Sequence, residues 1–106
     1  MLRVGVAGVM AFFIMGTADA SDYSKLSGGA LADFVRQDCG ACHGLTLKGG
    51  LGQPLTADKL GHLDVETIRG IVLDGVPGTA MPPWAGILTA EQADWIARQL
   101  KEGSLQ

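Results

Sequence analysis

The chain has little of what several protein classes require. Only two of its 106 residues are cysteines, so a framework of several disulfides is excluded. Its 8 Lys and Arg are outnumbered by 11 Asp and Glu and form no basic cluster, which disfavours a nucleic-acid partner. No long stretch alternates apolar and polar residues, and glycine interrupts the apolar runs, so strand signals are poor. A small helical domain is the class that remains.

The first twenty residues have the composition of an export signal. Arg3 precedes an apolar run over residues 4–15, and residues 18–20 form a small-x-small cleavage site. This run is shorter than the roughly 20 residues that a membrane-spanning helix needs. We therefore expect residues 1–20 to be a cleaved secretory signal peptide and residues 21–106 to form one periplasmic domain without stable membrane insertion. An uncleaved membrane anchor is the alternative.

Helical spacing dominates the rest of the chain. Asp64 stands where it can cap a helix, Ser27 can cap another, and Thr89 with Gln92 fits a capping box. The loops between the helices are rich in glycine. They are longer than a small helical bundle would tolerate unless they wrap around a bound group. We expect an all-α domain of three to four short helices. Apolar periodicity places them at residues 29–38, 57–60 (weakly), 65–74 and 90–101.

The most informative motif is CGACH, in which Cys39 and Cys42 are followed directly by His43. Residues three apart in a helix lie on one face, so the two sulfur atoms stand side by side. Cys-x-x-Cys-His is the attachment signature of c-type haem, with two thioether bonds to the porphyrin and an imidazole for the iron. We predict one covalently attached haem c, bound through Cys39 and Cys42, with His43 as an axial ligand of the iron.

Other interpretations of this motif remain open. A redox-active disulfide between Cys39 and Cys42 would make the protein a thiol-disulfide oxidoreductase, but that chemistry goes with a βαβ scaffold. A purely structural disulfide would close a very small loop and contribute little. A zinc site would need four ligands, which Cys39, Cys42, His43 and His62 could supply, but the adjacency of Cys42 and His43 makes binding by both awkward.

Met81 is the predicted second axial ligand. It is the only methionine after residue 20, and the two prolines that follow it hold its segment out of helical conformation. His62 and an open site are the alternatives. A His/Met pair raises the reduction potential relative to two histidines and keeps small molecules off the iron, as an electron carrier requires. If Met81 were displaceable, the protein would instead be a haem-binding sensor or a peroxidase-like enzyme.

With these residues placed, the chain resembles the class I cytochromes c of bacteria. Two longer stretches, CHGLTLKGGLG (42–52) and LDGVPGTAMPPW (73–84), are similar to the small periplasmic cytochromes that accompany haem-cd-type nitrite reductase in denitrifying bacteria. The resemblance implies a class I cytochrome c fold around the haem, in which Phe34 and Trp95 meet where the first and last helices cross. It also implies that a carbonyl, matched here to Pro54, accepts a hydrogen bond from His43.

The function implied is that of a periplasmic monohaem electron carrier and not of an enzyme. Its expected partners are redox proteins, either nitrite reductase or the proteins that make its specialised haem, and we expect a monomer. Only four lysines follow residue 20, so docking should depend on apolar contact over at most about 1,200 Å², the scale of transient redox complexes. The rim of the exposed haem edge is expected at Ala41, Leu45, Pro83 and Trp84.

Overall fold

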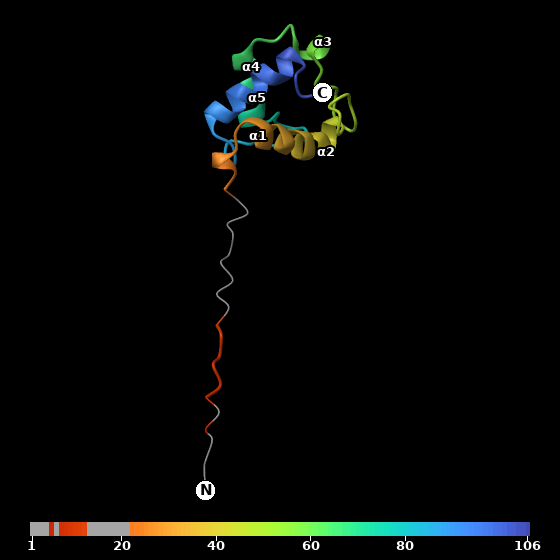
Figure 1. Ribbon diagram of the computed structural model, residues 1–106. Helices are drawn as coiled ribbons and strands as arrows, with labels where there is room; N and C mark the ends of the chain where they lie inside the picture. Colours follow the sequence, from red (N-terminus) through yellow and green to blue (C-terminus); the bar gives the residue numbers. More distant parts are fainter. Residues whose placement is uncertain (1–4, 6, 13–21) are drawn as a thin grey trace.

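The computed structural model describes residues 5, 7–12 and 22–106. Within residues 22–106 the regular structure is helical and contains no strand, which confirms the all-α prediction. Because α1, η2 and α2 follow one another without a break, they form one long helix, and α3, α4 and α5 complete the fold (Figure 1). The elements are η1 (Tyr23–Lys25), α1 (Gly28–Phe34), η2 (Val35–Cys39), α2 (Gly40–His43), α3 (Ala57–Leu60), α4 (Val65–Asp74) and α5 (Ala90–Glu102).

The long helix changes its winding immediately before the CGACH motif. The segment η2 is a π-helix that ends at Cys39, between two α-helical segments. Short π-helical turns are rare and are often found at functional sites, because the extra residue changes which side chains share a face. The sequence predicted a helix ending near Asp38, whereas the structure continues it to His43.

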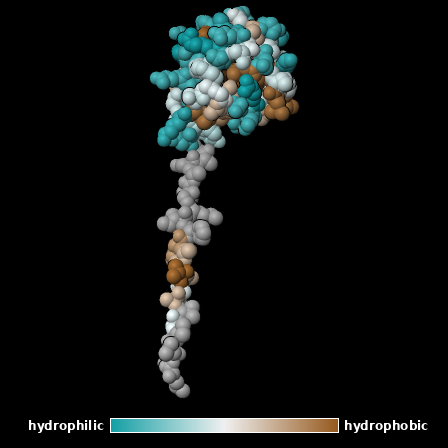
Figure 2. Space-filling model, in the orientation of Figure 1, coloured by the Kyte–Doolittle hydropathy of each residue, from teal (hydrophilic) through white to brown (hydrophobic). Residues whose placement is uncertain are grey.

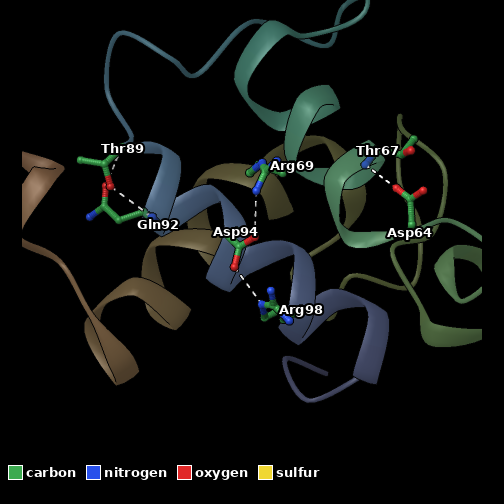
Figure 3. A network of polar contacts seen from close by, with 7 residues as sticks. All are labelled: Asp64, Thr67, Arg69, Thr89, Gln92, Asp94 and Arg98. Carbon is green, nitrogen blue, oxygen red and sulfur yellow. Dashed lines mark hydrogen bonds and ion pairs between the residues drawn. The ribbon is translucent and has the colours of Figure 1, made fainter.

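Helices α4 and α5 pack side by side and carry much of the core. Ile68 and Val72 of α4 are buried, and so is the apolar stripe of α5. Arg69 of α4 lies 3.1 Å from one carboxylate oxygen of Asp94 on α5, and Arg98 lies 2.8 Å from the other (Figure 3). The hydrogen bond and the charge of Arg98 lower the pKa of Asp94, and the nearby Arg69 lowers it further. The pair of helices is therefore joined by apolar and ionic contacts.

Two of the three predicted helix caps form as expected. The side chain of Asp64 accepts a hydrogen bond from the backbone N–H of Thr67 at 2.7 Å (Figure 3). Thr89 and Gln92 form the reciprocal capping box, with distances of 3.1 and 2.9 Å. Ser27 occupies the N-cap position of α1, but its side chain makes no capping hydrogen bond. The helix starts at α4 and α5 are thus fixed by local side chains.

The segment before α1 is fastened to the start of α5. Gln92 is 6% exposed, and its Nε2 donates to the carbonyl oxygens of Tyr23 at 2.7 Å and Leu26 at 2.9 Å. The ring of Tyr23 lies 5.2 Å from that of Phe34, whose edge meets Trp84 at 5.5 Å. The resemblance predicted that Phe34 would meet Trp95. Its ring partners are instead Tyr23, from the segment before α1, and Trp84, from the segment between α4 and α5.

The predicted signal peptide, residues 1–20, falls largely outside the described residues. In its described part, Val9, Met10 and Phe12 are between 87% and 91% exposed. None of the helices in the described ranges has the length and apolar character to cross a membrane. The visible face of the domain is mainly hydrophilic with isolated apolar patches (Figure 2).

Candidate haem site

Cys39, Cys42 and His43 lie together at the end of the long helix. Cys39 is half-buried, Cys42 is exposed, and neither forms a disulfide. Burial, with smaller effects from the nearby Asp38 and Cys42, raises the pKa of Cys39 to about 11. Attack on a disulfide requires a thiolate, and a thiol with so high a pKa is almost fully protonated at neutral pH. Cys39 is therefore poorly suited to attack a disulfide, and the described domain lacks the sheet that a thiol-disulfide oxidoreductase scaffold needs.

The loop that follows α2 folds back and holds the His43 ring. The Nδ1 atom of His43 lies 2.7 Å from the carbonyl oxygen of Gln53. A carbonyl oxygen only accepts, so Nδ1 carries the hydrogen, and the lone pair of the neutral ring is on Nε2. The resemblance assigned this contact to Pro54. The structure corrects that assignment to the preceding residue, because the loop approaches the ring one peptide earlier.

Close backbone contacts make this loop possible. The N–H groups of Gly49 and Gly52 donate to the carbonyls of His43 and Cys42 at 2.8 and 2.7 Å, which satisfies the end of α2. A Cβ at Gly52 would lie 2.9 Å from both Cε1 and Nδ1 of His43. Gly52 therefore leaves room for the ring on the side where the loop passes it. Neither Gln53 nor Gly52 was predicted from the sequence to contact His43, although both lie in the glycine-rich stretch that starts shortly after the motif.

Met81 lies in the segment between α4 and α5. Its side chain is half-buried, and its backbone N–H and carbonyl are both hydrogen-bonded within the segment, to Thr79 Oγ1 and Val76 N. His62, the alternative ligand, is exposed in the turn between α3 and α4. No three His, Cys, Asp or Glu side chains of the described residues come together as metal ligands, which argues against the zinc interpretation.

Three of the four predicted rim residues are exposed. Leu45 is 72% exposed, and Ala41 and Pro83 are also exposed. Trp84 differs from the expectation, because it is partly buried and packs against Phe34. Leu51, which was not among the predicted rim residues, is 96% exposed and lies in the same loop as Leu45. The exposure of Leu51 could not be predicted from the sequence and is seen only in the structure.

These residues fit a covalently attached haem. Two free thiols stand one helical turn apart, and the adjacent imidazole is held by Nδ1 so that Nε2 is available for a metal. The thioether of Met81, on a backbone-anchored segment, is of the soft type that would suit a second axial position. A c-type haem of the carrier type is tethered by two thioether bonds to its porphyrin, and its iron takes an imidazole and a thioether as axial ligands.

Comparisons with known proteins find c-type cytochromes. Residues 28–98 match the family model described as "Cytochrome C oxidase, cbb3-type, subunit III". Cytochrome c55X of Paracoccus denitrificans (strain Pd 1222) is 49% identical over 87 residues, which are 82% of this chain and 84% of that protein. The solved structure of "c-type cytochrome NirC" superposes with a TM-score of 0.69 at 48% identity, covering 71% of this chain and 88% of that one.

A larger protein contains a similar domain. The structure titled "Dihydro-heme d1 dehydrogenase NirN in complex with DHE" superposes with a TM-score of 0.60 at 37% identity. The match covers 64% of this chain but only 15% of that chain. A stretch of the dehydrogenase thus has the same fold as most of this protein.

The fold and these matches define a c-type cytochrome, an electron carrier with one covalently bound haem and not an enzyme. The chain belongs to the cytochrome c55X family, within the wider group of class I cytochromes c. The predictions of fold class, cofactor and carrier function are thereby confirmed.

Proposed function

We propose that the protein is a periplasmic electron carrier whose haem is attached through Cys39 and Cys42 and whose iron is bound by His43 and Met81. The observation that carries this proposal is the 2.7 Å contact between His43 Nδ1 and the Gln53 carbonyl. Such a contact orients the imidazole and raises its basicity as a metal ligand. It leaves Nε2 as the only ring nitrogen available to iron.

The bound haem supplies a single one-electron redox centre. His43 is oriented by Gln53, and Met81 offers a soft sulfur that favours ferrous iron and so raises the reduction potential. Both proposed ligands lie on backbone segments that are held by hydrogen bonds to other parts of the protein backbone or to nearby side chains. Little rearrangement of the chain is then needed when an electron arrives or leaves, as rapid transfer requires.

We place this carrier in haem d1 metabolism, which serves nitrite reductase. The dehydrogenase that shares the fold is named for the oxidation of a dihydro-haem d1. Removing two hydrogens from a dihydro-haem releases two electrons and two protons, so a one-electron carrier must accept twice per product. A separate protein resembling a domain of that dehydrogenase is suited to receive those electrons. Supply of electrons to the mature nitrite reductase is the second possibility.

Docking is proposed to occur over the loop that carries Leu45 and Leu51, which are 72% and 96% exposed. We expect a transient interface of at most about 1,200 Å² with a monomeric cytochrome. If apolar contact dominates, the second-order rate of electron transfer should change little when ionic strength is raised, because screening acts on charges. A steep decrease with salt would contradict this docking mode.

The ligands can be tested by spectroscopy of protein expressed with c-type maturation machinery. The ferric wild type should have the far-red sulfur-to-iron band, and Met81→Ala should lose it while its haem stays covalently bound. His62→Ala is the matched control, since His62 is exposed, and it should keep the band. Loss of the band in His62→Ala, or its retention in Met81→Ala, would refute the assignment.

The electron partner and the compartment need separate experiments. Mixing ferric cytochrome with the dehydrogenase and dihydro-haem d1 should produce ferrous cytochrome, two per haem d1 formed. If ferrous cytochrome is instead reoxidised only by nitrite reductase, the second possibility holds. The mass of the exported protein should correspond to a chain beginning at Ser21 plus one haem, and a colourless protein without added mass would refute the proposal.

A further inference from the structure

The segment that presents Met81 is anchored at both ends by the end of α4. We define the Met81 strap as residues 75–83. From its contacts we infer that Gly75 and Thr79 are positioning residues, which hold the Met81 backbone in place independently of iron. The inference rests on the proposed role of Met81 as an iron ligand and adds the residues that set its position.

Gly75 allows the strap to cross the end of α4 in direct contact. Its φ is 66° and its ψ is −170°, a region that side-chain-bearing residues rarely adopt. A Cβ on Gly75 would lie 2.7 Å from the Met81 carbonyl oxygen, and equally close to backbone atoms of Pro82 and Pro83. These are backbone atoms and cannot rotate away as a flexible side chain would. Any side chain at position 75 must therefore displace the strap.

Thr79 closes the strap from within. Its hydroxyl donates to the carbonyl oxygen of Val76 at 2.7 Å and accepts from the N–H of Met81 at 3.3 Å. The N–H of Val76 in turn donates to the Met81 carbonyl at 3.2 Å. Both backbone polar groups of Met81 are thus bonded inside a loop of six residues, from Val76 to Met81. A single hydroxyl serves two of the three contacts.

The strap cannot easily slide away from α4 as a unit. Beyond Pro83, the N–H groups of Trp84 and Ala85 each donate at 3.1 Å to carbonyls in the last turns of α4, those of Val72 and Leu73. Helix α4 is itself fixed to α5 by Arg69. A displacement caused by a Cβ at Gly75 is therefore expected to concentrate at Met81, between two fixed points.

This arrangement lowers the cost of binding iron, because the ligand loop has already lost its conformational freedom. When a strap is disordered or displaced, the same sulfur binds the metal with a lower effective affinity, and an external ligand competes better. The positions of Gly75 and Thr79 therefore determine how strongly Met81 excludes small molecules from the iron.

The test compares variants of the haem-loaded protein by their affinity for imidazole, which competes with Met81. Gly75→Ala should bind imidazole at least about tenfold more tightly and weaken the far-red band, given the usual cost of a side chain in this backbone region. Gly86→Ala is the control, because Gly86 is exposed nearby and a Cβ there meets nothing within 4 Å. Gly86→Ala should leave the imidazole affinity and the far-red band unchanged.

Thr79 provides a second pair of variants if Gly75→Ala does not fold. Thr79→Val keeps the shape but removes both hydroxyl contacts, and should bind imidazole several-fold more tightly, whereas Thr79→Ser should resemble the wild type. Amide hydrogen exchange gives a readout that does not involve the haem: the N–H groups of Val76 and Met81 should exchange faster in Thr79→Val than in Thr79→Ser.

The possible outcomes separate the two proposals. If the wild type has the band but Thr79→Val and Gly75→Ala match it in imidazole affinity and amide exchange, the positioning role is overturned and the ligand assignment stands. If the wild type lacks the band, Met81 is not the ligand. Amide hydrogen exchange is then the only test of whether Thr79 anchors the strap, and equal exchange in Thr79→Val and Thr79→Ser overturns that anchoring role.

Discussion

Replacing Gln92 tests how the chain before α1 is held to the domain. Its Nε2 bridges the carbonyls of Tyr23 and Leu26, and its Oε1 accepts from the backbone N–H of Thr89 at 2.9 Å. Gln92→Ala removes all three contacts at a site that is 6% exposed. At a net value of about 1 kcal/mol per hydrogen bond, the expected loss of stability is near 3 kcal/mol. For a domain of this size that corresponds to a fall in Tm of about 12–24 °C.

Gln92→Glu separates the capping function from the donor function. The glutamate side chain can still accept a hydrogen bond from the backbone N–H of Thr89. When ionised, however, it places a negatively charged oxygen against the carbonyl oxygens of Tyr23 and Leu26. Burial beside acceptors raises the pKa of this carboxyl above its value in the unfolded chain, so destabilisation is greatest above that pKa. As pH falls through it, the protonated group can donate to one carbonyl, and Gln92→Glu should regain stability relative to Gln92→Ala.

The assay is thermal unfolding of the haem-loaded protein, followed by circular dichroism between pH 4 and 7. Trypsin sensitivity at Lys25, which lies in the held segment, reports local release separately. Glu91→Gln is the control in the same helical turn, where the side chain is exposed, and should cost no more than about 0.5 kcal/mol. A Gln92→Ala protein within about 1 kcal/mol of wild type, with no gain in cleavage, would refute this reasoning.

Two further substitutions test other local contacts. Gly52→Ala would place a Cβ 2.9 Å from the ring of His43, so it should destabilise the protein by about 1–3 kcal/mol in chemical unfolding. The control is Gly29→Ala, at an exposed position of α1 where a Cβ meets nothing within 4 Å, and it should be neutral or slightly stabilising. The pKa of Asp64 is lowered in the folded protein by its hydrogen bonds from Thr67. The charged carboxylate therefore contributes stability above the unfolded-state pKa of about 4, and this contribution is lost as pH falls through the folded-state pKa. Asp64→Ala should therefore be less stable than wild type at pH 7, with the gap closing in acid, whereas a gap that stays constant with pH would contradict this assignment.

Several features could be predicted because their causes lie within a few residues of one another. The ranges of α3 and α4 match the prediction, since their apolar spacing and the Asp64 cap are local in sequence. The capping box at Thr89 needs only residues three apart. The CGACH motif likewise presents its three side chains within little more than one turn of continuous helix. Fold class and cofactor followed from these local patterns.

The contacts that tune the site depended on tertiary structure. The path of a glycine-rich loop decides whether the carbonyl of Gln53 or that of Pro54 contacts His43. Several such paths are compatible with the same sequence. Phe34 pairs with Trp84 rather than Trp95 because segments distant in sequence meet around it.

The same limit applies to Gly75. In the sequence it simply follows the last residue of α4, whereas its contact with the Met81 backbone arises from the return of the chain across α4. The sequence by itself determined the helices, the attachment motif and the candidate ligands, since these require only short-range periodicity and residue chemistry. Tertiary structure alone decided which backbone atoms hold His43 and Met81, because closeness between distant segments is set by the packing of the whole domain.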